Sequence, residues 1–172
     1  KRSVKSKFFT KSTVNHQHAG LSRERKMSKQ AIPAELPPWE HMFRAYDIRG
    51  VYGKDLTTEI AETIAKGFGT YIGKDKNLAV GRDIRIGSTE LKNAVVQGLI
   101  STGCNVVDFG IVTTPLMYFG IAHEEKDGGI MVTASHNPAQ WNGLKLCREK
   151  GIIVGEGSGI EKIKEIIKKK KF

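Results

Sequence analysis

The most informative segment of the chain is Gly129-Ile130-Met131-Val132-Thr133-Ala134-Ser135-His136-Asn137-Pro138. Its first four residues form an apolar run typical of a buried strand, and the closing Asn-Pro pair starts a turn. The pattern therefore places the Ser135 hydroxyl just beyond a strand, with His136 beside it. Open α/β sheets bind ligands beyond the carboxyl ends of parallel strands, so this serine is a candidate nucleophile or phosphate carrier. A serine that only bonds its own turn is the alternative interpretation.

Helices and short strands alternate on both sides of this stretch. Apolar residues share one face of a helix from Ile60 to Ile72, which Thr57 or Thr58 can cap. A second helix is predicted from Ser88 to about residue 103, and a third opens at Thr114-Pro115. Strands are predicted at residues 78–80, 106–109, 129–132 and 143–147. A last helix is predicted to begin with a capping box of Ser158 and Glu161, and its C-terminal lysines suit the helix dipole better than they suit a binding tail.

Strands and helices in this order form two βαβ units, which require parallel strands and right-handed crossovers. We therefore expect an α/β fold, a three-layer α/β/α sandwich with a mixed, mostly parallel sheet. The strand at 143–147 follows a short connection and should pair antiparallel with its predecessor. The carboxyl ends of the parallel strands then bring together Gly81-Arg82-Asp83, residues 111–114 and Ala134-Ser135-His136. Arg82 and Asp83 are interpreted as an internal ion pair at the strand end.

Length and charge narrow the class of protein. The chain has 172 residues, enough for one domain with a real core, and a net charge of +10. Residues 1–26 hold eight Lys/Arg against the single acid Glu24, and Lys168–Lys171 add four more, so the two ends account for the excess. A nucleic-acid-binding protein would spread its basic residues over one face of the fold, which disfavours that class. No apolar run approaches the roughly 20 residues of a membrane span.

The two cysteines, Cys104 and Cys147, have neither metal-ligand nor disulfide spacing, which fits a reducing cytoplasm. Residues 1–40 lack helical and strand periodicity and are interpreted as a disordered basic leader, with the folded domain at 41–172. The leader could be a mitochondrial transit peptide. Met27 could equally be the true start, with residues 1–26 translated from upstream sequence.

Four motifs occur in order along the chain. They are Phe43-Arg44-Ala45-Tyr46-Asp47-Ile48-Arg49-Gly50, Gly81-Arg82-Asp83, Thr133-Ala134-Ser135-His136-Asn137-Pro138 and Asn142-Gly143-Leu144-Lys145. Together they closely resemble the first domain of the α-D-phosphohexomutases, the phosphomannomutase and phosphoglucomutase family. The tyrosine in the first motif and the Asn-Gly-Leu-Lys run look more like this branch than like the phosphoglucosamine mutases. The resemblance runs from about Phe43 to the chain end.

The resemblance implies a role for each matching residue. Ser135 would be the phosphoserine that gives its phosphoryl group to a hexose phosphate, and its phosphate would also be a ligand of Mg²⁺. Arg49 and Lys145 would be the flanking cations, with Lys145 and Tyr46 also contacting the substrate, and His136 would assist proton movement. These types suit phosphoryl transfer, which needs cations on the phosphate oxygens and a proton path. Without the resemblance, Arg49 and Lys145 could be solvated, His136 could brace the turn and Tyr46 could be core.

Family members have four domains, a hexose 1,6-bisphosphate activator, and a magnesium site on an Asp-Gly-Asp-Gly-Asp triplet that this sequence lacks. We therefore expect the first domain of a mannose or glucose 1-phosphate/6-phosphate mutase, a truncated piece that is inactive alone. Its remaining domains II–IV could be separately encoded partners. The alternatives are a non-catalytic binding module of the same fold and a phosphoglucosamine mutase domain.

Overall fold

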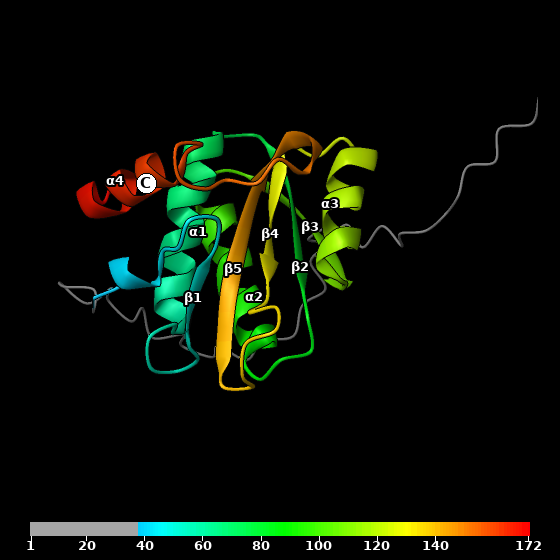
Figure 1. Cartoon of the computed structure of the whole chain (residues 1–172). Coiled ribbons are helices and arrows are strands. Elements are labelled where there is room, and N and C mark those ends of the chain that lie inside the picture. Colours follow the sequence, from blue (N-terminus) through cyan, green and yellow to red (C-terminus); the bar gives the residue numbers. More distant parts are fainter. Residues whose placement is uncertain (1–37) are drawn as a thin grey trace, which may run out of the picture.

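A five-stranded mixed sheet forms the centre of the computed structural model, which describes residues 38–172 (Figure 1). Most of the helices and strands lie where the hydrophobic periodicity predicts them. In chain order the elements are η1 (Glu40–Met42), β1 (Ile48–Val51), α1 (Thr58–Ile72), β2 (Asn77–Arg82), α2 (Ser88–Ser101), β3 (Asn105–Ile111), α3 (Thr114–His123), β4 (Gly128–Val132), β5 (Trp141–Arg148), η2 (Glu149–Gly151) and α4 (Ile160–Lys169).

The strand order in the sheet is β1-β5-β4-β2-β3. β2 pairs in parallel with both β3 and β4, whereas β5 pairs antiparallel with β4 and with β1. The expected two βαβ units and the antiparallel return strand are therefore confirmed. β1, which the sequence did not predict as a strand, closes the sheet at one edge. The carboxyl ends of β2 and β4 lie side by side, because Arg82 is the register partner of Val132.

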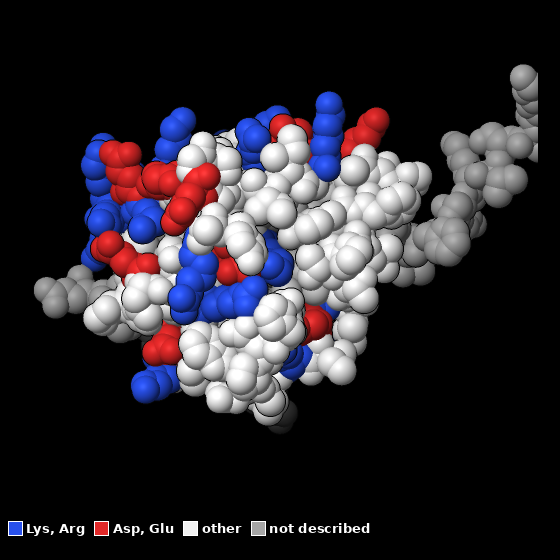
Figure 2. Space-filling view, in the orientation of Figure 1, with Lys and Arg blue, Asp and Glu red and all other residues white. Residues whose placement is uncertain are grey.

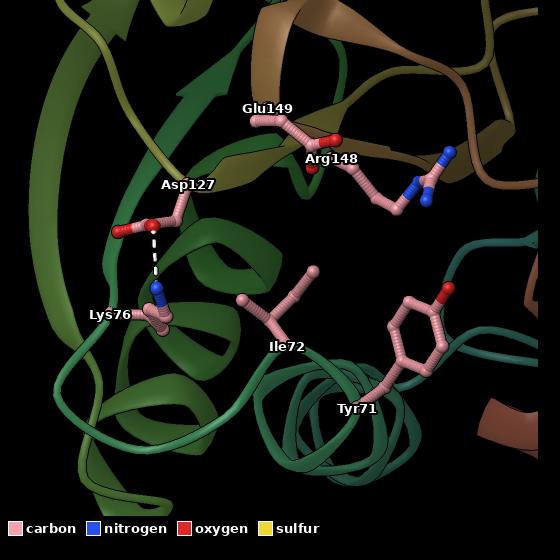
Figure 3. A pocket seen from close by; sticks show the side chains of 6 residues that line it. All are labelled: Tyr71, Ile72, Lys76, Asp127, Arg148 and Glu149. Atoms are coloured by element: carbon pink, nitrogen blue, oxygen red, sulfur yellow. Dashed lines mark hydrogen bonds and ion pairs between the residues drawn. The ribbon is translucent and has the colours of Figure 1, made fainter.

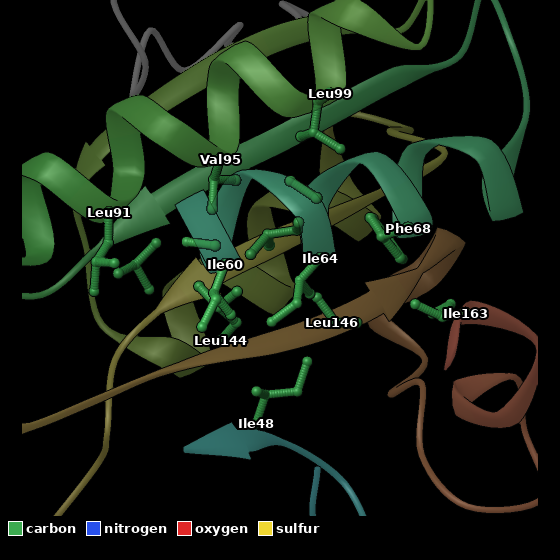
Figure 4. Packing of buried hydrophobic residues seen from close by; sticks show 14 of the residues in the cluster. Ile48, Ile60, Ile64, Phe68, Leu91, Val95, Leu99, Leu144, Leu146 and Ile163 are labelled. Carbon is green, nitrogen blue, oxygen red and sulfur yellow. The ribbon is translucent and has the colours of Figure 1, made fainter. Parts of the chain in front are cut away.

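The larger core lies between the sheet and helices α1 and α2 (Figure 4). Alternate strand residues point into it, so Ile130 and Val132 of β4 and Leu144 and Leu146 of β5 pack there, while Met131 points to the other face. α4 packs on the far side of α1, and Ile163 and Ile167 belong to the same core. Fully burying each such side chain contributes about 1.5–3 kcal/mol.

Helix α3 covers part of the opposite face and completes the three-layer α/β/α sandwich (Figure 1). It packs against β2 and β4, where Met117 and Ile121 join Met131 in a smaller core. Lys145 is the register partner of Met131, so its side chain also points to this face. α3 packs mainly over β2 and β4 and reaches β5 only near Cys147. The part of this face formed by β1 and the start of β5 therefore carries polar side chains.

The hydrogen bonds at the helix starts show which capping residues act as caps. Thr57 caps α1 by accepting a hydrogen bond from the backbone N–H of Ile60, 3.4 Å away, and Thr113 caps α3 in the same way. The expected capping box of α4 is wrong. Its Ser158 hydroxyl accepts instead from the N–H of Gly155, at 2.7 Å, within a glycine-rich turn that delays the helix to Ile160. α1 is the longest helix at 15 residues, and none formed by residues 38–172 suits a membrane crossing.

The folded domain begins earlier than residue 41. Trp39 is 8% exposed and packs edge-on against Phe43, with the ring centroids 5.4 Å apart. Its indole belongs to the larger core. The last residues of the expected leader are therefore part of the fold. The rest of that leader, including Met27 and any transit peptide, lies at positions 1–37, outside the described residues.

Candidate active site

The serine loop, residues 133–140, connects β4 to β5 at the carboxyl edge of the parallel strands. Ser135 has a φ of 57°, the left-handed region that a residue with a side chain seldom adopts. Its backbone N–H donates to the hydroxyl of Thr133 at 2.9 Å, and the N–H of Asn137 donates to the carbonyl of Ala134 at 3.1 Å. The turn therefore holds an exposed serine in a strained conformation, which is typical of functional sites.

His136 lies beside the serine, as the sequence suggested. Its Nδ1 atom is 3.3 Å from Oγ of Ser135, and both side chains are exposed. Either atom can be the donor, depending on the tautomer of the imidazole. The pair is therefore placed to exchange a proton at the end of β4.

Asp47 is the residue that organises the cations. Its side chain is 3% exposed, and its Oδ2 atom accepts hydrogen bonds from Nε and Nη2 of Arg49 at 2.9 and 2.7 Å and from Nζ of Lys145 at 3.0 Å. Two cations that would otherwise repel each other are thus held together by one buried carboxylate. Sequence reasoning gave Asp47 no role. Its spacing from Arg49 could have indicated this role, because residues two apart in an extended segment lie on the same face.

Arg49 also reaches the serine loop. Its Nη1 atom donates to the side-chain oxygen of Asn137 at 2.5 Å, so the guanidinium is anchored on both Asp47 and the loop. Among residues 38–172 no hydrogen bond joins the Ser135 hydroxyl directly to Arg49 or Lys145. The structure therefore brings Arg49 to the loop through Asn137 and holds Lys145 beside Arg49 through Asp47, with neither cation in contact with the serine oxygen.

Tyr46 lies at the outer side of this cluster. Its ring is 5.4 Å from the Lys145 ammonium, a cation–π distance, and its side chain is 56% exposed. The alternative that Tyr46 is a core residue is therefore wrong. Its exposed ring is free to contact a ligand that approaches Lys145.

Gly143 permits the close approach of β1, β5 and the serine loop. A Cβ atom at this position would lie 2.8 Å from the carbonyl oxygen of Thr133 and would also collide with that of Ile48. The N–H of Thr133 meanwhile donates to the Gly143 carbonyl at 2.9 Å. Only a residue without a side chain fits here, so the Asn-Gly pair in the fourth motif has a packing reason.

The expected ion pair between Arg82 and Asp83 does not form. The Asp83 carboxylate instead lies 3.3 Å from Nε of Arg85 and accepts from the hydroxyl of Ser88 at 2.6 Å. Within residues 38–172 the Arg82 side chain bonds only the backbone carbonyl of Asp83. Asp83 caps the turn into α2 and turns Arg85 toward the serine loop, which sequence reasoning missed because Arg85 lies in a loop without periodicity.

Basic side chains gather over the middle of the sheet, beside a broad uncharged surface over α3 (Figure 2). The Asp47 cluster consists of Asp47, Arg49 and Lys145. Tyr118 of α3 packs with Cys147 of β5 on the same face, close enough for the Asp47 charge to act on it. Burial raises the pKa of the Tyr118 hydroxyl to about 12, with smaller contributions from Cys147 and Asp47. Burial likewise raises the pKa of the Cys147 thiol to about 12, which leaves this cysteine inert at neutral pH.

A Mg²⁺ ion would need more ligands than this part of the chain supplies. Within the described residues no three His, Cys, Asp or Glu side chains are grouped as a metal site. Asp47 is the one buried Asp or Glu among residues 38–172, and its Oδ2 atom is occupied by Arg49 and Lys145. Magnesium requires near-octahedral oxygen coordination, which one serine oxygen does not provide.

A shallow pocket of about 280 Å³ lies at the opposite, amino edge of the parallel strands (Figure 3). Asp127, which precedes β4, forms an ion pair of 3.0 Å there with Lys76, which precedes β2. The Nε atom of Arg148 is buried there and finds no partner among residues 38–172. The other lining residues are Tyr71, Ile72 and Glu149. The pocket includes no residue of the serine loop or of the Asp47 cluster.

Comparison with known proteins places these features in a family. Residues 40–172 match the family described as phosphoglucomutase/phosphomannomutase, alpha/beta/alpha domain I. The chain is 41% identical over 134 residues to a phosphomannomutase of Vibrio cholerae, covering 76% of this chain and 29% of that protein. It is 38% identical over 135 residues to a phosphoglucomutase/phosphomannomutase of Thermococcus kodakarensis, with 76% and 28% covered.

Among solved structures, a phosphoglucomutase/phosphomannomutase family protein from Burkholderia thailandensis superposes with a TM-score of 0.67 at 37% identity. That likeness covers 76% of this chain and 30% of the other. The chain thus spans less than a third of the length of each of these three relatives. With the family match over residues 40–172, it follows that the chain belongs to the phosphoglucomutase/phosphomannomutase family and corresponds to its alpha/beta/alpha domain I.

Proposed function

We propose that Ser135 carries the phosphoryl group in a phosphohexomutase that interconverts the 1- and 6-phosphates of mannose or glucose. One observation carries the proposal. A strained, exposed serine follows a parallel strand, and its loop is bonded to an arginine that shares a buried carboxylate with a lysine. A hydroxyl held this way, with two fixed cations nearby, has the parts that a phosphate carrier needs.

The chain's own residues would divide the work as follows. Phosphoserine would give its phosphoryl group to a sugar hydroxyl, so the bond between Oγ and phosphorus breaks while an oxygen–phosphorus bond to the sugar forms. Arg49 and Lys145 would neutralise charge on the transferring group, because this loose transition state is stabilised mainly by positioning and charge. The sugar hydroxyl loses its proton and Oγ of Ser135 gains one, and His136 would relay this proton, because an imidazole nitrogen can accept or donate it. Tyr46 would border the sugar beside Lys145.

The complete reaction needs components beyond residues 38–172. Mg²⁺ would supply Lewis-acid stabilisation of the phosphoryl oxygens when bound, and a hexose 1,6-bisphosphate would load the serine. Domains II–IV, as implied by the family, would complete the metal and sugar sites. A phosphoglucosamine mutase domain has the same requirements, whereas a non-catalytic module would keep the serine without passing its phosphate on.

The test is to incubate the chain with glucose 1,6-bisphosphate and Mg²⁺, then map phosphate by peptide mass spectrometry. We expect slow uptake of one phosphoryl group at Ser135, none in Ser135→Ala, and normal uptake in Ser101→Ala, which alters an α2 serine bonded to its own helix. Uptake only at other residues, or none, contradicts the proposal. Phosphoserine that is never discharged by mannose 6-phosphate or glucose 6-phosphate, even after addition of the remaining domains, favours the non-catalytic module.

A further inference from the structure

The Arg85 side chain donates hydrogen bonds to backbone carbonyl groups at the serine loop. Its Nη2 atom donates to the carbonyl oxygens of Ser135 at 2.6 Å and Asn137 at 2.7 Å. Its Nη1 atom donates to those of Pro138 at 3.0 Å and Trp141 at 3.2 Å. One planar guanidinium therefore fixes four carbonyl groups, three in the serine loop and one at Trp141, the first residue of β5. The point charge of a lysine cannot do this.

Arg85 is itself anchored. Its Nε atom lies 3.3 Å from the Asp83 carboxylate, and its backbone N–H donates to the same side chain at 3.0 Å. Asp83 accepts from the Ser88 hydroxyl, which in turn accepts from the side-chain amide of fully buried Asn142 at 2.9 Å. This chain of hydrogen bonds joins the start of α2 to the start of β5. The guanidinium is therefore held in place before any ligand binds.

The direction of these carbonyls determines the direction of the neighbouring N–H groups. No peptide bond among residues 38–172 is cis, and in a trans peptide the C=O and the next N–H point to opposite sides. Because the carbonyls of Ser135 and Pro138 turn toward Arg85, the N–H groups of His136 and Ala139 turn away from it. Neither N–H donates to any residue in this part of the chain. The carbonyl groups of Ser135 and Pro138 thus face Arg85, and the unbonded N–H groups of His136 and Ala139 face the opposite way.

We propose that Arg85 is the positioning residue of the serine loop, and that the backbone N–H of His136 which it orients is a hydrogen-bond donor to the phosphoryl group on Ser135. The proposal rests on the function proposed above. Backbone N–H groups next to a left-handed residue form a common anion-binding arrangement, and Ser135 is the left-handed residue here. Fixed N–H donors stabilise a transferring anion without reorganisation during the reaction.

Amide hydrogen exchange tests whether Arg85 holds the serine loop in place, and it does not depend on phosphoryl transfer. In Arg85→Lys the N–H groups of Asn137 and Trp141, which close the two turns of the loop, should exchange at least tenfold faster than in the wild-type chain. Amides in α1 should not change. The matched control is Arg82→Lys, because among the described residues the Arg82 side chain bonds only the carbonyl of Asp83. This variant should leave the loop protected. Equal protection of these two amides in the wild type and in Arg85→Lys would contradict the positioning role of Arg85.

Phosphoryl uptake tests the consequence. The rate of Ser135 labelling by glucose 1,6-bisphosphate should fall about tenfold or more in Arg85→Lys, while the bisphosphate concentration at half-maximal rate changes less than twofold. A wild-type rate in a variant with a loosened loop overturns the positioning role. If the wild-type chain takes up no phosphate, the proposed function fails. The proposed hydrogen bond from the His136 N–H to the phosphoryl group then fails with it. The exchange measurement still decides whether Arg85 holds the loop in place.

A measurement on the wild-type chain covers the case in which Arg85→Lys does not fold. Nitrogen-15 NMR of the arginine side chains should show the Arg85 guanidinium with slow rotation and protected Nη protons, because each of its Nη atoms donates to two carbonyl groups. Arg82 should show fast averaging. A freely rotating Arg85 guanidinium would overturn the proposal.

Discussion

The Nη1 atom of Arg49 and the Oδ1 atom of Asn137 are 2.5 Å apart, although 88 positions separate the two residues in sequence. This hydrogen bond joins the edge strand β1 to the serine loop. Arg49 is held on its other side by Asp47, so the loop, the edge strand and the buried carboxylate act as one unit. A change at Asp47 should therefore affect both the fold and the site.

Asp47→Asn removes the charge that both cations share. The neutral amide leaves Arg49 and Lys145 facing each other with little compensation, and breaking a buried ion pair from one side is strongly destabilising. We expect the free energy of unfolding to fall by about 2–4 kcal/mol, measured by urea denaturation. Asp75→Asn is the control, because Asp75 is exposed and asparagine tolerates its φ of 62°. A change at Asp47 no larger than this control would show that the carboxylate does not hold the cluster.

Trp39→Ala should destabilise the domain. The indole is largely buried in the larger core and packs against Phe43, so its removal leaves a cavity. The expected loss is about 2–4 kcal/mol, at the low end of buried Trp truncations because the residue is near the edge of the fold. A chain that starts at Pro38 should have the same thermal midpoint as the full chain, whereas the midpoint of a chain that starts at Met42 should be several degrees lower. Equal midpoints for these two chains would contradict a structural role for Trp39.

Much of this architecture was predictable because local and global signals agree. The apolar face of α1, the Thr114-Pro115 start of α3, and the run Gly129–Val132 each match their element, and short connections leave few topologies. The α4 start was not predictable, because a capping box and a glycine turn compete at the same residues. Asp47 and Arg85 were missed for another reason. Their roles depend on partners that are distant in sequence, Lys145 for one and the serine loop for the other.

The backbone of Ser135 offers a test of strain. A left-handed φ costs a residue with a Cβ atom about 1–2 kcal/mol, and glycine avoids this cost. Ser135→Gly should therefore be more stable than Ser135→Ala by about 1 kcal/mol, although glycine is usually the less favourable residue. Urea denaturation of both variants measures the difference. If alanine were equally stable or better, the turn would not hold Ser135 in the left-handed region.

Stability should decrease at alkaline pH. The pKa values of Cys147 and Tyr118 are both raised to about 12 from ordinary values of 9.0 and 10.0. Between these limits the unfolded chain releases protons that the folded chain retains, so ionisation favours unfolding as pH rises. The contribution is complete below about pH 9 and is lost on approaching pH 12. Urea midpoints should fall across this window, and less steeply in Cys147→Ala. A flat profile, or one equally steep in the variant, would argue against burial of an un-ionised thiol.

The chain alone should not sustain mutase turnover. A mutase must hold a bisphosphate and present both of its ends in turn, whereas residues 38–172 supply the serine loop and two cations but no grouped metal ligands. Losing oriented binding removes roughly 7–11 kcal/mol of catalytic advantage, and losing the metal removes several more. The assay is the purified chain with mannose 1-phosphate or glucose 1-phosphate, Mg²⁺ and bisphosphate activator, with Ser135→Ala as the background. Steady turnover that disappears in Ser135→Ala would contradict this prediction, and would mean that one domain assembles a complete site.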